Sequence, residues 1–107
     1  MPGRFHYEHA VIERWFGPDE LELLIDLGFD LTHRVRLRLR DVDVPPRGDA
    51  ASRDMVGAIA ARFPPGTRVR VETERMGKHR NYRARLSEAE TEADVNDFAR
   101  ALERGVA

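Results

Sequence analysis

The segment from His33 to Arg40, HRVRLRLR, alternates polar and apolar residues without a break. Successive side chains of a β-strand point to opposite faces, so this pattern predicts a strand. Val35, Leu37 and Leu39 are expected on the face that packs into a core, and a row of four arginines is expected on the other face. The chain must therefore build its core around a sheet.

The remaining segments with a clear period or turn signal give four more strands and two helices. Turn-forming residues separate them, such as Gly17-Pro18-Asp19 between the first two strands and Pro64-Pro65-Gly66 after the first helix. Asp49 and Asp94 are the expected N-caps of the two helices. The predicted strands cover residues 5–16, 20–26, 67–73 and 82–86, a polar loop covers 74–81, and the helices cover about 50–63 and 95–104.

The predicted order βββ-α-ββ-α is that of a five-stranded OB-type barrel, a mainly β (α+β) fold. An open α+β sheet is the alternative. The length of 107 residues and the mass of 12.3 kDa suit one domain over residues 1–107, with the second helix at its C-terminal end.

The charge is almost balanced overall but is divided along the chain. There are 18 basic and 19 acidic residues, and Lys78 is the only lysine. Residues 1–86 carry a net charge of +3 and residues 87–107 carry −4, so the C-terminal helix is acidic. The balance excludes a uniformly basic, histone-like protein. The lack of cysteine excludes disulfides and thiolate zinc sites.

No stretch has the length and apolar character of a signal peptide or a membrane span. We therefore expect no membrane partner, and a cytoplasmic protein, or a virion-associated one if a phage encodes it. The sequence specifies no oligomeric state.

The ordered set of motifs resembles the thermonuclease (staphylococcal nuclease-like) family, in particular its short bacterial and bacteriophage members. The similarity covers about residues 9–107 and implies an OB-type barrel with calcium-dependent phosphodiester hydrolysis. The motifs that carry it are Ile25-Asp26-Leu27-Gly28-Phe29, then RVRLRLRDVDVPP over 34–46, Pro65-Gly66-Thr67, VRVET over 69–73 and Val95-Asn96-Asp97.

The resemblance also assigns roles to individual residues. The two calcium-binding carboxylates of the family fall on Asp19 and Asp43, and the carbonyl ligand falls on Val44. Glu20 adds a third carboxylate beside Asp19. The strand arginine that holds the scissile phosphate falls on Arg38.

Other positions depart from the family pattern. Pro46 stands where the family has the glutamate that activates water, and proline has no proton acceptor. A general base contributes ~10²–10⁴-fold to such a reaction, so its loss is severe. The second phosphate-binding arginine falls on Asn81, although a shift of one residue places Arg80 there. Gly17 replaces the first aspartate of the metal-binding turn.

The basic segment over 75–85 and the arginine row are the candidate contacts for nucleic acid. For the row, the alternative is a solvated face on which the arginines pair with the acidic residues of the preceding strand. For Trp15 and Phe16, stacking on bases competes with packing in the core. The expected nucleic-acid-binding residues are Arg36, Arg38, Lys78, Arg80, Tyr82 and Arg83.

These features predict a catalytically impaired thermonuclease-like domain. It is expected to bind nucleic acid weakly or to bind a protein partner, with a structural or assembly role if the setting is a bacteriophage. The alternative is an active calcium-dependent nuclease that uses Asp19, Asp43 and Arg38. Calcium is required only by that alternative.

Overall fold

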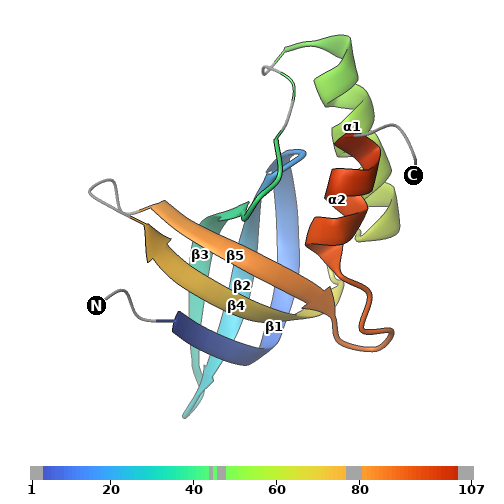
Figure 1. The fold of residues 1–107 in the computed structure, drawn as a ribbon. Helices are drawn as coiled ribbons and strands as arrows, with labels where there is room; N and C mark the ends of the chain where they lie inside the picture. Colours follow the sequence, from blue (N-terminus) through green and yellow to red (C-terminus); the bar gives the residue numbers. More distant parts are fainter. Residues whose placement is uncertain (1–3, 44, 46–47, 77–80, 104–107) are drawn as a thin grey trace.

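The computed structural model describes residues 4–43, 45, 48–76 and 81–103. Five strands and two helices follow each other in the predicted order βββ-α-ββ-α (Figure 1). Neither helix has the length and apolar character needed to cross a membrane within these residues. The elements are β1 (Arg4–Gly17), β2 (Glu20–Gly28), β3 (Leu31–Leu39), α1 (Ala50–Arg62), β4 (Arg68–Met76), β5 (Asn81–Glu88) and α2 (Val95–Glu103).

The five strands form a closed barrel in the order β1-β2-β3-β5-β4. This confirms the predicted OB-type barrel and excludes the open sheet. All neighbouring strands are antiparallel except β3 and β5, which run parallel and pair only at Arg38–Arg83 and Leu39–Ala84. The contact between β3 and β5 that closes the barrel is therefore short.

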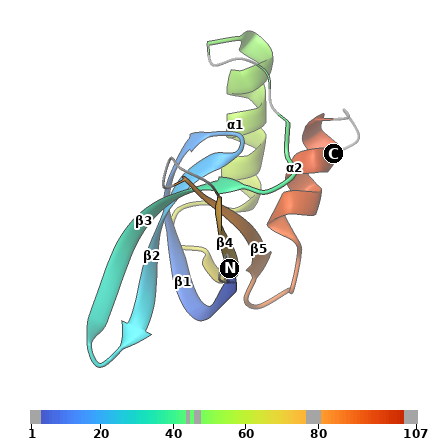
Figure 2. The same cartoon turned by 60° about the vertical axis from the view of Figure 1, so that its left-hand side comes forward.

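The long first strand closes the barrel by pairing with two neighbours. Its second half, from Ala10 to Gly17, pairs with β2, and its first half, from Arg4 to Val11, pairs with β4. The register shifts after Tyr7, after Ile12 and after Trp15. Such bulges bend and twist a strand, and they allow β1 to turn from one side of the barrel to the other (Figure 2).

The hairpin of β2 and β3 projects beyond the barrel, as both ribbon views show (Figures 1 and 2). β1 pairs with β2 only as far as Ile25, whereas β2 continues to Gly28 and β3 begins at Leu31. Gly28, Phe29 and Asp30 in the turn all have a positive φ, at 80°, 55° and 61°. Only glycine adopts this conformation without strain, so Phe29 and Asp30 are held there by the tight turn.

The core fills the barrel and the space beneath the helices. Leu37 and Leu39 of β3 are buried and Val35 is partly buried, which confirms the predicted apolar face of that strand. The other buried apolar residues are Ala10, Ile12, Leu21, Leu23, Ile25, Val42, Met55, Ile59, Phe63, Val69, Val71, Ala84, Leu86, Val95 and Ala99.

The two helices meet over the end of the barrel at Phe63. The Trp15 indole Nε1 donates a hydrogen bond to the Phe63 carbonyl oxygen at 2.9 Å. The ring of Phe63 packs edge-on against Phe98 of α2, with 5.5 Å between ring centroids. Trp15 therefore packs against the core, in agreement with the packing alternative and not with stacking on bases.

The two predicted N-caps differ. The Asp94 carboxylate accepts a hydrogen bond from the Asp97 N–H at 2.9 Å and caps α2 as predicted. Asp49 occupies the N-cap position of α1, but the structure shows no capping hydrogen bond from its side chain.

The predicted loop over 74–81 is too long. β4 continues to Met76 and β5 begins at Asn81 and continues to Glu88, because the two strands stay paired from Val69–Glu88 to Met76–Asn81. Glu74 lies opposite Arg83 in this ladder. The two strands thus continue as a paired ladder through a segment whose polar composition alone indicates a loop.

Candidate functional site at the end of the barrel

Asp19 lies in the turn between β1 and β2 and is buried, with only 7% of its surface exposed. Its carbonyl oxygen accepts a hydrogen bond from the Leu39 N–H at 2.7 Å, which ties the turn to the end of β3. Its carboxylate lies 3.7 Å from the Arg38 guanidinium. Burial raises the pKa of Asp19 above its ordinary value, although the attraction of Arg38 opposes this rise.

Arg38 lies where β2, β3 and β5 meet. It pairs in the sheet with Glu20 of β2 and with Arg83 of β5, and its guanidinium also lies 3.9 Å from the Glu20 carboxylate. Arg83 is close enough to lower the pKa of Asp19. We call Asp19, Glu20, Arg38 and Arg83 the Arg38 cluster. It gathers two carboxylates and two guanidiniums at one end of the barrel.

The other arginines of the row also have carboxylate partners. Arg36 donates a hydrogen bond to Glu20 at 3.0 Å, and Arg34 lies 3.6 Å from Glu22. Arg40 donates to Glu74 at 3.0 Å.

The prediction that the row pairs with the acidic residues of the preceding strand is therefore confirmed for Glu20 and Glu22. Asp26 instead accepts a hydrogen bond from the Gly28 N–H at 2.8 Å. Exposed ion pairs add little stability, but each one cancels charge on the surface.

The ring of Phe16 contacts two guanidiniums. The Arg36 guanidinium lies over its ring, 3.9 Å from the centroid, and the Arg14 guanidinium lies 5.7 Å from it. Such cation–π contacts hold a guanidinium in place. The Arg36 guanidinium thus occupies one face of Phe16 on which a base could otherwise stack.

The described residues do not fit a calcium ion. Calcium takes six to eight oxygen ligands, but no group of three or more carboxylate or histidine side chains converges anywhere in the described part of the chain. Asp43 is exposed, and its N–H donates a hydrogen bond to Glu103 at 3.2 Å. The Asp19 carboxylate lies near that of Glu20, but both carboxylates face the Arg38 guanidinium. Val44 and Pro46 lie outside the described residues.

The described residues among the expected nucleic-acid contacts lie in two places. Arg38 and Arg83 belong to the Arg38 cluster, and Arg36 lies beside it through its contact with Glu20. Tyr82 is 38% exposed and lies beside a small cavity of about 120 Å³ on the inner side of β3. Lys78 and Arg80 lie outside the described residues.

Asn96 belongs to the Val95-Asn96-Asp97 motif of the resemblance, but the sequence assigned it no role. It is 1% exposed, and its side-chain oxygen accepts a hydrogen bond from the Leu86 N–H at 3.0 Å. Its side-chain nitrogen donates to the carbonyl oxygens of Arg40 and Ala84, both at 3.0 Å. Asn96 thereby joins α2, β5 and the end of β3 behind the Arg38 cluster. The available signals were its place in that motif and its position directly after Val95, which was predicted to face the core.

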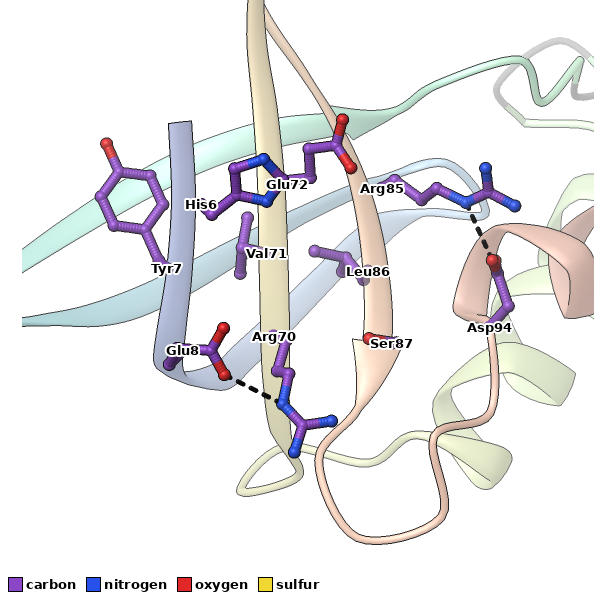
Figure 3. A pocket seen from close by; sticks show the side chains of 10 residues that line it. All are labelled: His6, Tyr7, Glu8, Arg70, Val71, Glu72, Arg85, Leu86, Ser87 and Asp94. Atoms are coloured by element: carbon purple, nitrogen blue, oxygen red, sulfur yellow. Dashed lines mark hydrogen bonds and ion pairs between the residues drawn. The ribbon is translucent and has the colours of Figure 1, made fainter. Parts of the chain in front are cut away.

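A second hollow of about 230 Å³ lies beside β1, β4 and β5 (Figure 3). Its two arginines are already engaged: Arg70 donates to Glu8 at 3.1 Å, and Arg85 donates to Asp94 at 2.9 Å. Both ion pairs are drawn in Figure 3. Because each guanidinium already faces a carboxylate, this hollow is poorly suited to an anionic ligand.

Comparison with known proteins finds no protein-family model and no curated protein that matches the chain. The function must therefore be argued from the residues and their geometry.

Proposed function

We propose that this chain is a catalytically impaired thermonuclease-like domain that acts as an interaction module. The observation that carries the proposal is the 3.7 Å contact between Arg38 and Asp19. The resemblance assigns the arginine to a phosphate and the carboxylate to a metal ion. Here each group has the other as its partner.

The rest of the barrel end supports impaired catalysis. Pro46 supplies no general base, and the described carboxylates do not converge on a cation site. Removing a single electrostatic stabiliser of a transition state costs on the order of 10²–10³-fold in rate. Losses of base, metal and phosphate clamp together leave little of the family's hydrolytic chemistry.

The charge pattern favours a protein partner over nucleic acid. Nucleic-acid binding gains affinity from unneutralised cations that replace counterions around the phosphates. Arg34, Arg36 and Arg38 already face Glu22, Glu20 and Asp19 from the neighbouring β-hairpin. These carboxylates cancel part of the charge that the row offers to the many phosphates of a nucleic acid.

A cleavage assay tests the proposal. Labelled single-stranded DNA and RNA are incubated with the protein and calcium, and the unmodified chain is compared with Arg38→Ala and with Arg34→Ala as a control on the same strand. We expect no calcium-dependent product in any of the three. Cleavage that needs calcium and Arg38, but not Arg34, would establish the active nuclease and refute the proposal.

Binding of the same oligonucleotides is measured by fluorescence anisotropy between 50 and 200 mM salt, a range of roughly fourfold over which phosphate contacts weaken steeply. We expect weak binding with a shallow salt dependence. Tight binding that falls steeply with salt would make nucleic acid the partner in place of a protein.

A further inference from the structure

Within the described residues, one edge of β3 is open over most of its length. Along its length it pairs with β2, from Glu20–Arg38 to Gly28–Leu31, but on its other side β5 pairs with it only at Arg38 and Leu39. Within the described residues, no strand lies beside Leu31–Leu37 on that side. An unpaired strand edge is a template for pairing with another chain.

The backbone groups that face this edge follow from two hydrogen bonds. The Leu39 N–H donates toward the β1–β2 turn at 2.7 Å, and the Arg40 N–H donates toward β5 at 2.9 Å. Consecutive residues of a strand direct these groups to opposite sides. The N–H and C=O groups of Thr32, Arg34 and Arg36 therefore point to the open edge.

The two faces beside the edge differ in chemistry. On the outer face, the side chains of Arg34 and Arg36 are 60% and 51% exposed, whereas those of their partners Glu22 and Glu20 are only 17% and 12% exposed. The guanidiniums are therefore the groups that an approaching chain meets first. On the inner face, Val35, Leu37 and Tyr82 help to line the cavity of about 120 Å³. Arginines therefore flank the open edge on the outer face, and an apolar hollow flanks it on the inner face. The two kinds of side chain alternate along β3.

The tip of the same hairpin adds an exposed apolar surface. Leu27, Phe29 and Leu31 are 47%, 95% and 59% exposed. A single exposed apolar residue is normal on a protein surface, but here three large ones occur within five residues. They lie next to the start of the open edge.

We propose that the open edge of β3 binds an extended acidic segment of a protein partner by strand addition. The segment pairs its main chain with Thr32, Arg34 and Arg36. It directs acidic side chains toward Arg34 and Arg36 on the outer face, and apolar side chains toward Val35 and Leu37 on the inner face. This inference rests on the proposed role as an interaction module and names the partner's chemistry.

A second copy of this chain is a poor occupant. Antiparallel pairing of two β3 edges places arginines opposite arginines, which is unfavourable. The chain's own acidic segment over 88–94 is already engaged, since Glu90 pairs with Arg68 at 2.8 Å and Asp94 pairs with Arg85 at 2.9 Å. The occupant is therefore a different chain.

The probe is a fluorescein-labelled heptapeptide of alternating glutamate and valine, and its binding is followed by anisotropy. A peptide of alternating lysine and valine controls for charge. A second control is the glutamate peptide with a methyl group on every second backbone nitrogen, which removes the N–H groups that would pair with β3. We expect the unmodified glutamate peptide to bind and both controls to bind at least tenfold more weakly.

Two substitutions at one position separate the guanidinium from the backbone. Arg34→Ala removes the charge alone, whereas Arg34→Pro also removes the N–H that faces the open edge. Neither removes a β2–β3 hydrogen bond, because the Arg34 backbone groups face away from β2. We expect proline to weaken peptide binding by about 5–10-fold more than alanine, which is the effect of one lost hydrogen bond.

Amide exchange in the unmodified protein gives a readout that does not depend on how a variant folds. We expect the peptide to slow exchange at Thr32, Arg34 and Arg36. Equal binding of the methylated peptide, unchanged exchange at these amides, or protection of them by single-stranded DNA instead of the peptide would overturn the inference. Calcium-dependent cleavage in the separate assay would refute the proposed function and leave the peptide result standing.

Discussion

Replacing Asn96 tests how the barrel is tied to α2. Its side chain is almost fully buried and makes three hydrogen bonds, to Leu86, Arg40 and Ala84. Asn96→Ala removes all three and leaves space in the core. Because the bonds link α2 to β5 and to the residue that follows β3, we expect a global loss of stability instead of local fraying of α2.

The size of the loss follows from which groups keep a partner. The Leu86 N–H is buried, and a buried orphan of this kind costs about 1–3 kcal/mol. The Ala84 carbonyl suffers less, because it still accepts the Arg40 N–H at 2.9 Å. With the lost packing included, we expect about 2–4 kcal/mol in the free energy of unfolding. That corresponds to a fall in Tm of roughly 10 °C or more.

Urea and thermal unfolding followed by circular dichroism measure this loss. Asn96→Asp is the matched control, because it keeps the shape and the acceptor for Leu86 but turns a charged oxygen toward two carbonyls. Its pKa should be raised, so its deficit should be full at neutral pH and should shrink as the pH falls toward about 4. A cost below about 0.5 kcal/mol for Asn96→Ala, or an Asn96→Asp protein of full stability at neutral pH, would refute the reasoning.

Three further changes give distinct outcomes. Trp15→Phe removes the hydrogen bond to the Phe63 carbonyl and should cost about 1 kcal/mol in scanning calorimetry; an unchanged Tm would contradict that bond. Burial raises the pKa of Asp19, so its ionised form opposes folding above the folded-state pKa and this penalty disappears below the unfolded-state value. Asp19→Asn should therefore stabilise the protein at neutral pH relative to acid pH, and the reverse trend would mean that Arg38 outweighs burial. Phe29→Ser at the 95% exposed hairpin tip should change the free energy of unfolding by less than about 0.5 kcal/mol; a larger loss would show that Phe29 packs in the fold.

The fold was largely predictable because its main signals are local. The alternation around Leu37 specifies which face of β3 is buried, and the apolar spacing around Ile59 and Phe63 specifies how α1 packs. The continuation of β4 to Met76 was not predictable in the same way. It depends on a partner strand that begins at Asn81, and the polar residues between them give no period.

The candidate site was predictable only where neighbours in space are also neighbours in a hairpin. Two alternating strands joined by a tight turn place Glu20 and Glu22 beside Arg36 and Arg34, so this pairing follows from sequence. The surroundings of Asp43 depend on the path between β3 and α1 and on where α2 ends. Its contact with Glu103 joins residues 60 positions apart, and no local pattern records it.

The ion pairs of the arginine row disfavour a nucleic acid more than they disfavour an added protein strand. A phosphate that approaches Arg36 or Arg38 meets guanidiniums already held by carboxylates and gains little from releasing counterions. An added strand depends less on these charges, because its affinity comes mainly from main-chain hydrogen bonds to β3. The open edge also offers alternating N–H and C=O groups, which a peptide can pair with and a nucleic acid cannot reproduce. The arrangement of charge and backbone at β3 therefore favours a polypeptide partner.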